Sequence, residues 1–310
     1  MERLEYDSYG GSEVLRLRSF ELPNPAENEV VVRVAAASIN PMDWKIRNGE
    51  MKMFIGSKFP RALGTDFSGT VEAVGSKVTK FKPGDDVVGT VSMKISGAFA
   101  PKLITTEDLL VKKPNDLSFV QAACLPIPGA TAWDVLVNKT GLKRNQKVFI
   151  NGAAGAVGQA AVAIARAYDS EIVGRVGTKS MDQAKSLGLN SALNYNKPIP
   201  VSLHGMFDIV FDCNGSLSTK EQEQLTKKGG KIADIVPSPA KIIKSIIFRR
   251  SRKFVASNPK AENLQPVIDL AATGKFTIPI ARTVSLSDAS AVMDSLERGE
   301  RLNGKVVIAF

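Results

Sequence analysis

The chain has 310 residues, of which 44% are hydrophobic and 23% charged, and its formal net charge is +10. This balance is typical of a folded chain long enough for two domains, and it excludes an intrinsically disordered protein. No apolar run approaches the ~18 residues of a membrane span, and acidic residues stand near the N-terminus where a signal peptide has a basic and then an apolar segment. We therefore expect a cytoplasmic protein.

The first hundred or so residues have the pattern of short β-strands. The segments 29–39, 68–75 and 82–91 are rich in β-branched residues or alternate between apolar and polar side chains, and clusters of Gly and Pro separate them. Such strands predict a partly closed barrel or a sandwich.

From about residue 118 the pattern changes to strands that alternate with helices. Continuous apolar strands in this arrangement indicate a parallel sheet covered on both faces, which is a doubly wound domain. The expected strands are 147–151, 171–176, 191–195, 207–213 and 231–236, and the expected helices begin near Ala156 and cover 180–188 and 218–228.

The tail contains two predicted helices and a final strand. The segment 261–274 has a helical pattern that ends at Gly274, and 287–299 has a capping Ser287 or Asp288 and ends at Gly299. The last residues, "GKVVIAF" (304–310), form a strand that requires a partner sheet.

One basic segment, "FRRSRKF" (248–254), follows the amphipathic "KIIKSII". It leaves two interpretations open. Either a basic amphipathic helix contacts a membrane surface, or a helix packs on its own domain with its basic end solvated or near an anionic cofactor. The other cations are scattered and no nucleic-acid motif is present, so we expect no nucleic-acid partner. The first interpretation assigns the membrane contact to Arg249, Arg250, Arg252 and Lys253.

Potential soft metal ligands are scarce in this sequence. Only Cys124, Cys213 and His204 are present, whereas a zinc site needs about four clustered ligands. We therefore predict no metal site and two buried free thiols in a reducing compartment.

The stretch "KVFINGAAGAVGQAAVAIARA" (147–167) places several glycines where a strand passes into a helix. A dinucleotide pyrophosphate binds free backbone N–H groups at a helix N-terminus, and glycines there allow a tight turn and close approach. The register is Ala153-x-Gly155-x-x-Gly158, with a further glycine at 152. The strand before it, the helix after it and a second strand about twenty residues on favour a dinucleotide site.

The end of the second strand indicates which nicotinamide cofactor binds. NAD sites carry an acidic residue there for the ribose hydroxyls, but "RVGTKS" (175–180) has none. Thr178 and Ser180 can donate hydrogen bonds and Lys179 supplies a positive charge, which favours the 2′-phosphate of NADPH.

These features resemble the medium-chain dehydrogenase/reductase superfamily, and within it the zinc-independent quinone oxidoreductases, along essentially the whole chain. The segments that carry the resemblance are "SINPMDWKIRNG" (38–49), "LGTDFSGTVEAVG" (63–75), "KPGDDVVG" (82–89), "AACLPIPGATAWDVL" (122–136) and "NGAAGAVG" (151–158). The tail "NPKAENLQPVIDLAATGK" (258–275) is most similar to chloroplast-envelope quinone oxidoreductase homologues and alkenal reductases.

The resemblance implies an α/β fold made of a GroES-like, partly open β-barrel catalytic domain and a doubly wound Rossmann domain. The catalytic domain would cover 1–118 and 259–310, and the NADPH-binding Rossmann domain 119–258. Zinc-dependent relatives have a cysteine where Asn40 stands and Gly-His-Glu at 64–66, where this chain has Gly-Thr-Asp. The resemblance therefore implies no metal.

The resemblance also implies the site residues. Asn40 and Asp43 would form the catalytic part, with Asn40 donating a hydrogen bond to the substrate or the nicotinamide carboxamide, and Asp43 fixing the loop, for instance through Arg47. Thr131 would reach the nicotinamide or a phosphate, and Tyr195 would lie beside the adenosine. The expected cofactor-binding residues are Asn40, Thr131, Ala153, Ala154, Gly155, Ala156, Val157, Gly158, Gly177, Thr178, Lys179, Ser180, Tyr195, Asn214 and Val236.

The activity implied is an NADPH-dependent hydride transfer to quinones or α,β-unsaturated carbonyls by a homodimer. These acceptors are already electrophilic, so orientation and hydrogen bonds suffice where no zinc polarises the carbonyl. No side chain is required as the acid if water delivers the proton, and we expect no catalytic role for His204. The alternatives are a carbonyl or alcohol oxidoreductase and a non-catalytic NADPH-binding sensor or structural protein.

Overall fold

The computed structural model describes residues 1–236, 252–254 and 259–310. The chain divides into two compact units. Unit 1 comprises Met1–Ile127, Pro259–Ala272 and Thr277–Phe310, and unit 2 comprises Pro128–Asn258 and Thr273–Phe276. The first boundary falls after Ile127 rather than after residue 118, because α3 (Phe119–Ala123) packs against strands β3 and β5 of unit 1.

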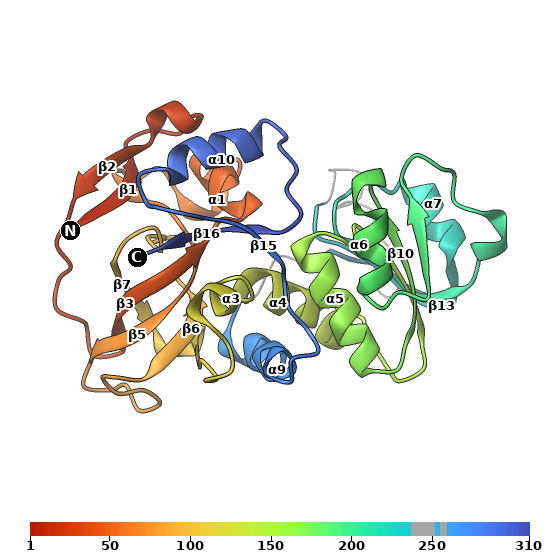
Figure 1. Cartoon of the computed structure of the whole chain (residues 1–310), viewed down its shortest axis with the longest axis horizontal. Coiled ribbons are helices and arrows are strands. Elements are labelled where there is room, and N and C mark those ends of the chain that lie inside the picture. The colour runs from red at the N-terminus through yellow and green to blue at the C-terminus, as the bar shows by residue number, and fades with distance from the viewer. Residues whose placement is uncertain (237–251, 255–258) are drawn as a thin grey trace. The chain divides into compact units, whose positions relative to one another are not determined.

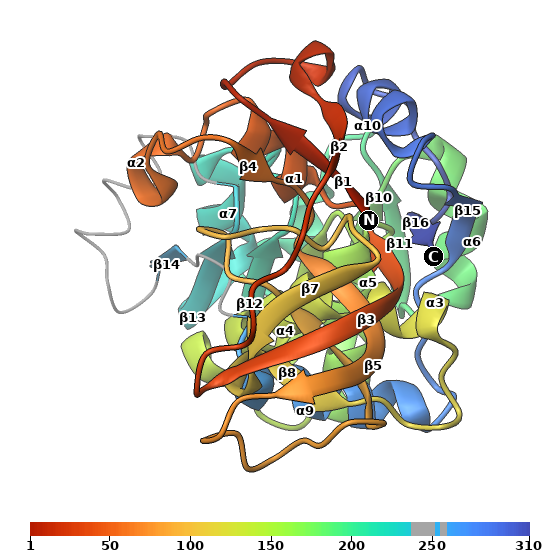
Figure 2. The ribbon, with the colours of Figure 1, turned by 90° about the vertical axis from the view of Figure 1, so that its left-hand side faces the viewer.

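Unit 1 is a barrel-like arrangement of strands that are antiparallel except for the β15–β16 pair. Its larger sheet has the order β15-β16-β3-β5-β6-β8, with β7 also pairing with β3, and β2-β1-β4 form a smaller sheet. Strands β7, β3 and β5 lie side by side in Figure 2. The strands are β1 (Glu2–Tyr6), β2 (Arg16–Ser19), β3 (Glu29–Ser38), β4 (Arg61–Ala62), β5 (Asp66–Val74), β6 (Asp86–Thr90), β7 (Lys102–Thr106), β8 (Leu110–Lys112), β15 (Ile280–Val284) and β16 (Lys305–Ala309).

The helices of unit 1 are short at its N-terminal end and longer in the returning segment. They are η1 (Ser12–Val14), α1 (Pro41–Arg47), α2 (Lys52–Ile55), η2 (Glu107–Leu109), α3, α9 (Ala261–Ala272) and α10 (Ala289–Glu297), and α4 (Pro126–Trp133) crosses the boundary into unit 2. Both predicted tail helices are therefore present, and α9 accommodates Pro266 in its interior.

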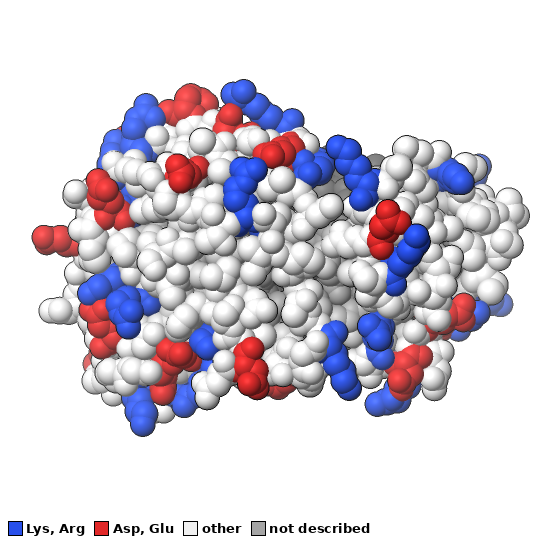
Figure 3. Space-filling view, viewed as in Figure 1, with Lys and Arg blue, Asp and Glu red and all other residues white. Residues whose placement is uncertain are grey.

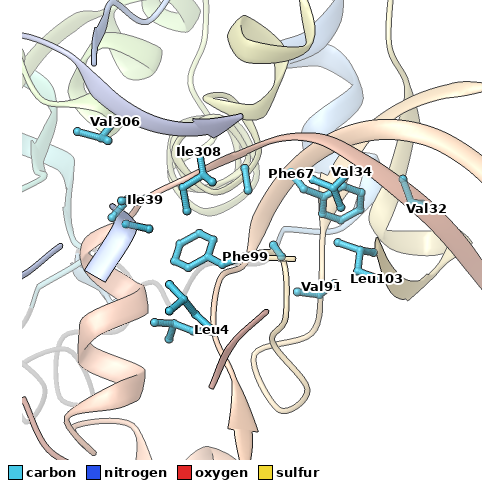
Figure 4. Close-up of a cluster of buried hydrophobic side chains, with 14 of the residues drawn as sticks. Leu4, Val32, Val34, Ile39, Phe67, Val91, Phe99, Leu103, Val306 and Ile308 are labelled. Atoms are coloured by element: carbon cyan, nitrogen blue, oxygen red, sulfur yellow. The ribbon is translucent and has the colours of Figure 1, made fainter. Parts of the chain in front are cut away.

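The core of unit 1 joins the first and the last strands of the chain. Val32 and Val34 of β3 and Phe67 of β5 are buried, and Ile308 of β16 belongs to the same cluster (Figure 4). Strand β16 pairs antiparallel with β3, with Val307 opposite Ser38. The predicted final strand thus finds its partner in the barrel, and burial of these apolar side chains stabilises the return of the chain to unit 1.

Unit 2 contains a parallel sheet of six strands in the order β11-β10-β9-β12-β13-β14. This is the order of a doubly wound dinucleotide-binding sheet, whose switch point lies between β9 and β12. Strands β10 and β13 of this sheet are labelled in Figure 1. The elements are η3 (Asp134–Lys139), β9 (Lys147–Asn151), α5 (Ala156–Ala167), β10 (Glu171–Val176), η4 (Thr178–Ser180), α6 (Met181–Ser186), β11 (Ser191–Asn194), η5 (Val201–Leu203), β12 (Phe207–Asp212), α7 (Thr219–Leu225), β13 (Thr226–Asp234) and β14 (Arg252–Phe254).

The two units confirm the predicted fold class, a partly open β-barrel domain with a doubly wound α/β domain. One predicted helix is shorter than expected. Helix α7 ends at Leu225 rather than at residue 228, because Thr226 already pairs with Phe207 at the start of β13.

The basic segment differs from both sequence interpretations where the structure describes it. Arg252–Phe254 is not helical but forms β14, which pairs with β13. Arg252 is only 3% exposed, because its guanidinium binds Gln222 and the carboxylate of Asp234. It therefore does not present its charge to a membrane, whereas Arg249 and Arg250 lie outside the described residues.

The charges on the face shown in Figure 3 are mixed. Lysine and arginine side chains alternate there with aspartate and glutamate, in agreement with the scattered cations of the sequence. Among the residues that the structure describes, no helix has the length and the apolar character required to cross a bilayer.

Candidate functional site

The glycine turn at the end of β9 has the geometry of a phosphate-binding turn. Gly152 has φ +90°, and the N–H groups of Gly152 and Ala153 both donate to the carbonyl of Arg175 on β10. Gly155 precedes the first turn of α5, and the first bond into the helix runs from Gln159 N–H to Gly155 O. The amides at the start of α5 are therefore available for an anion at the positive end of the helix dipole.

Two glycines in this turn serve different purposes. A Cβ at Gly158 would lie 2.1 Å from the carbonyl oxygen of Gly152, so only glycine lets α5 pack this closely on the turn. A Cβ at Gly155 would meet only that same oxygen, at 3.4 Å, so space remains on this side of the turn. The turn thus fits a pyrophosphate, and Ala153 to Gly158 are the residues that would hold it.

Tyr195, which follows β11, and Asn214, which follows β12, both lie beside the turn. The Asn214 Nδ2 donates to the Tyr195 hydroxyl at 2.9 Å, and that hydroxyl would be 3.5 Å from a Cβ at Gly152. Burial raises the pKa of Tyr195 to about 12, so its phenol is neutral at physiological pH. The Arg175 guanidinium lies 5.5 Å from the centre of the tyrosine ring. The structure therefore brings together two predicted residues and the glycine turn.

Asn151 and Asp212, which the sequence analysis missed, hold the loop after β12 in place. The Asn151 Nδ2 donates to Asp212 Oδ1 and to Asn214 Oδ1, each at 2.7 Å. Asp212 also accepts the backbone N–H groups of Gly215 and Leu217. A polar residue at the end of each of two neighbouring parallel strands is the sequence signal that indicates this network.

The segment after β10 carries the expected groups for a phosphate, although Thr178 is already engaged. Its hydroxyl accepts hydrogen bonds from the Nδ2 atoms of Asn194 and Asn196, at 3.0 and 3.2 Å. Lys179 is exposed and Ser180 is partly buried. Of the positive charges in this segment, Lys179 is therefore the one that is accessible to a ligand.

Two further predicted residues occupy separate places in unit 2. Thr131 is buried on α4, and Val236 follows β13 with 39% of its surface exposed. Gly215 lies against Val236, since a Cβ there would be 2.7 Å from the Val236 carbonyl oxygen. The loops after β12 and β13 are thus in contact.

In unit 1, Asn40 lies in a buried polar cluster rather than on an open surface. It is 3% exposed, and its carboxamide bridges two charged residues. The Lys305 Nζ donates to Asn40 Oδ1 at 2.5 Å, and Asn40 Nδ2 donates to Asp66 Oδ2 at 2.9 Å. Sequence reasoning missed Lys305, which comes from the first residue of the last strand.

Asp43 caps α1 and does not pair with Arg47 as expected. Its carboxylate accepts the backbone N–H of Asn40 at 2.7 Å and the hydroxyl of Thr65 at 3.2 Å. Arg47 instead binds the carbonyl of Gly10 and the carboxylate of Glu297. Asp43 therefore fixes the loop at Asn40 by capping its own helix. It does not act through Arg47, because α10 supplies the partner of that arginine.

Burial shifts the titration of this cluster. It raises the pKa of Asp43 to about 7 and that of Asp66 to about 6, while the Lys305 ammonium acts in the opposite direction on both. Burial also raises the pKa of the Cys124 thiol to about 11, so the thiol stays protonated near neutral pH. Of these three raised pKa values, those of the two carboxyls therefore lie near neutral pH.

The donor set of this cluster does not fit a zinc ion. Zinc sites use cysteine, histidine or several carboxylates, whereas the Asn40 oxygen here receives a lysine ammonium. Within 1–236, 252–254 and 259–310, no group of three His, Cys, Asp or Glu side chains is arranged to hold a metal ion.

A barrel unit with this polar cluster and a dinucleotide-type sheet with this glycine turn define a medium-chain dehydrogenase/reductase. Two family models match the chain: the alcohol dehydrogenase GroES-like domain over residues 26–115 and the zinc-binding dehydrogenase over 187–308. A chloroplast envelope quinone oxidoreductase homolog of Arabidopsis thaliana is 32% identical, over 99% of this chain and 98% of its own. The chain belongs to the quinone oxidoreductase family of this superfamily.

Other relatives and solved structures agree with this assignment. An NADPH-dependent alkenal/one oxidoreductase of Arabidopsis thaliana is 30% identical, over 99% of this chain and 79% of its own. The structure of the quinone oxidoreductase from Coxiella burnetii matches with a TM-score of 0.89 and 28% identity, covering 100% of this chain and 99% of that one. The Escherichia coli quinone oxidoreductase complexed with NADPH matches with a TM-score of 0.83 and 25% identity, over 100% of both chains.

Proposed function

We propose that this protein is an NADPH-dependent oxidoreductase that transfers hydride to quinones or to α,β-unsaturated carbonyls. The relatives named quinone oxidoreductase and alkenal/one oxidoreductase support the reaction, and the Escherichia coli enzyme complexed with NADPH supports the cofactor. The observation that carries the proposal is the glycine turn, where Gly155 leaves space beside the free amides of α5.

The cofactor residues in this proposal are those of the turn and of the loops around it. The free amides at the start of α5 bind the pyrophosphate, with the turn from Ala153 to Gly158 around it, and Tyr195 with Asn214 borders the adenosine. Lys179 pairs with the 2′-phosphate, because it is exposed and lies in η4, shortly after the end of β10. Thr178, held by two asparagines, shapes the loop that carries Lys179.

NADPH, when bound, supplies the hydride, and the chain orients the acceptor and stabilises the charge that develops on it. Asn40 is the candidate hydrogen-bond donor, and Asp43 fixes the loop on which Asn40 stands. The Cys124 thiol is too weak an acid to protonate the reduced acceptor, and the carboxyls of Asp43 and Asp66 are wholly buried. We therefore assign the proton that completes the reaction to water rather than to a side chain.

The proposal involves no metal, since the donor set around Asn40 and Asp66 suits an ammonium. Acceptors that are already electrophilic are the ones that such a site can reduce, because their reduced forms spread the charge over a conjugated system. The resemblance further supports a homodimer, which light scattering of the purified protein would test.

The test is the oxidation of NADPH in the presence of three acceptors, namely phenanthrenequinone, an enone and a plain aldehyde. We expect turnover of the first two. Turnover of the aldehyde alone would support a carbonyl or alcohol oxidoreductase, and NADPH binding without turnover of any acceptor would support a sensor.

A pair of variants tests the assignment of Asn40. Asn40→Ala is expected to lower kcat, whereas His204→Ala should leave it within about threefold, a difference of under about 1 kcal/mol. His204 is the matched control because it is the only histidine and follows η5, away from the glycine turn in sequence. An inactive His204→Ala enzyme with intact NADPH binding would contradict the assignment.

A further inference from the structure

We propose that Lys305 is a positioning residue of this site: its ammonium holds the carboxamide of Asn40 in one orientation, so that Asn40 acts on a bound molecule only as a hydrogen-bond donor. The inference rests on the proposed function, because it assigns a role within the same site. It concerns a residue that no motif of the sequence indicated.

The chemistry of the two partners determines which way the carboxamide points. A lysine ammonium can only donate, so the atom that faces Lys305 must be the oxygen of Asn40. An ionised aspartate can only accept, so the atom that faces Asp66 must be the nitrogen. The two contacts, at 2.5 and 2.9 Å, satisfy both requirements at once. In the reverse orientation two donors would face each other, as would two acceptors.

One N–H of Asn40 is only weakly engaged. The second acceptor near Nδ2 is the carbonyl oxygen of Ser38, at 3.4 Å, which is longer than an ordinary N–H···O bond. The oxygen of Asn40 is occupied by Lys305. The group can therefore offer a donor to an acceptor oxygen that gains negative charge when the hydride arrives, which is the interaction that lowers a barrier.

The fold delivers Lys305 to this place with little freedom. The backbone N–H of Ile39 donates to the carbonyl of Val306 at 3.0 Å, so the residues next to Asn40 and Lys305 are bonded to each other. Ile39 and Val306 are both buried in the core of unit 1 (Figure 4). The N–H of Lys305 also donates to Pro279 O at 2.8 Å. The backbone at both ends of the contact is thus fixed. Lys305 as a whole residue is 7% exposed.

A double-mutant cycle tests whether Lys305 acts through Asn40. The four proteins are the wild type, Asn40→Ala, Lys305→Met and the double variant, because methionine keeps an unbranched chain without a donor. Each single variant should lower kcat about tenfold or more. The double variant should fall within about threefold of Asn40→Ala alone, since the effects of residues that act as a unit do not add. The Kd for NADPH, which unit 2 mainly determines, should change less than kcat.

Two further variants are needed to interpret the loss of kcat. One separates the orienting effect of Lys305 from the effect of its charge, and the other shows what the loss of an unrelated lysine does. Lys305→Gln removes the charge but keeps a donor, so it should retain about fivefold more kcat than Lys305→Met. It also replaces Lys305→Met in the cycle if the latter does not fold. Lys102→Met is the control, because Lys102 is a partly exposed lysine of unit 1 that pairs with Glu72 on the surface. Its kcat should equal that of the wild type.

Additive effects in the cycle would overturn the proposal, as would wild-type turnover by Lys305→Met. A wild type that turns over no acceptor would refute the proposed function instead. If the wild type turns over no acceptor, the midpoints of urea unfolding of the same four proteins test whether Lys305 is linked to Asn40. Non-additive midpoints support a direct link between Lys305 and Asn40, and additive midpoints reject it.

Discussion

Replacing Gly158 by alanine tests the close packing of α5 on the glycine turn. The added Cβ would lie 2.1 Å from the oxygen of Gly152 and 2.7 Å from the Cα of Ala153. Both are backbone atoms, which cannot rotate out of the way as a side chain can. Ordinary contacts begin near 3.4 Å, so the helix or the turn would have to shift by more than an ångström at this point.

Two opposing terms determine how much Gly158→Ala changes the free energy of unfolding. Alanine is favoured over glycine within a helix by about 1 kcal/mol. Overpacking of a rigid site costs about 1–3 kcal/mol and occasionally more, and an overlap with backbone at 2.1 Å belongs at the upper end of that range. We therefore expect a net loss of about 2 kcal/mol, which for a unit of this size lowers Tm by roughly 4–8 °C.

The assay is thermal unfolding together with titration of NADPH, and Gly155→Ala is the matched control. Gly155 has φ −74° and ψ 163°, a conformation that alanine adopts freely, and its Cβ would meet only one atom at 3.4 Å. Gly155→Ala should therefore keep the wild-type Tm but weaken NADPH binding, because the methyl group fills the space left for the pyrophosphate. Gly158→Ala should lower Tm and weaken binding together.

A Gly158→Ala protein that is as stable as the wild type would refute the packing argument. A Gly155→Ala protein that binds NADPH with unchanged Kd would refute the placement of the pyrophosphate. The two results are independent, because one measures the folded turn and the other its ligand.

Two predictions concern buried charges. The pKa of Asp66 rises from 3.8 to about 6 on folding, so the folded state binds this proton more tightly than the unfolded state, and stability falls as pH rises from about 4 to about 6. Asp66→Asn should reduce that fall by up to about 3 kcal/mol in urea unfolding at several pH values, and an unchanged pH dependence would contradict the shift. Arg252→Met should destabilise unit 2 by about 3 kcal/mol because it leaves buried Asp234 without this cation, whereas Arg144→Met, on an exposed pair, should cost less than about 1 kcal/mol. Equal losses for the two arginine variants, measured by thermal unfolding, would show that burial is not the cause.

The glycine turn could be predicted from the sequence because all of its determinants are local. Strand, turn and helix occupy one continuous stretch, and the predicted strand 147–151 and helix start at Ala156 match β9 and α5. Apolar periodicity and glycine spacing are sufficient for such a unit, since its hydrogen bonds join neighbouring segments. The alternation of strands and helices likewise predicts that the strands run parallel.

The partners of Asp43 and Arg47 could not be predicted in the same way. The two residues are four positions apart on a helix, a spacing that favours an ion pair. The structure separates them because Glu297 of α10, far along the chain, reaches Arg47, while Asp43 turns back to cap its own helix. Tertiary contacts thus override a local pattern that is worth only a few tenths of a kcal/mol.

The basic segment shows a related limit of composition. Composition alone treats every cation of a run as exposed, so the run predicts a charged surface. Arg252 is buried because β14 extends the parallel sheet and brings its guanidinium to Gln222 and Asp234. Only the pairing of strands determines which cation of a run faces inward.

The contact between Asn40 and Lys305 spans 265 residues, and this distance makes unit 1 dependent on the end of the chain. The first 127 residues contain Asn40, Asp43 and Asp66, so they bury two carboxyls whose ionisation burial opposes. The ammonium that lowers the pKa of both stands at the start of β16, which follows unit 2 in the sequence. A protein that keeps β16 but lacks the ammonium, such as Lys305→Met, should therefore hold these carboxyls in their protonated form to higher pH, with the oxygen of Asn40 released. The same strand that completes the sheet thus also determines the charge and the orientation of the groups at the candidate site.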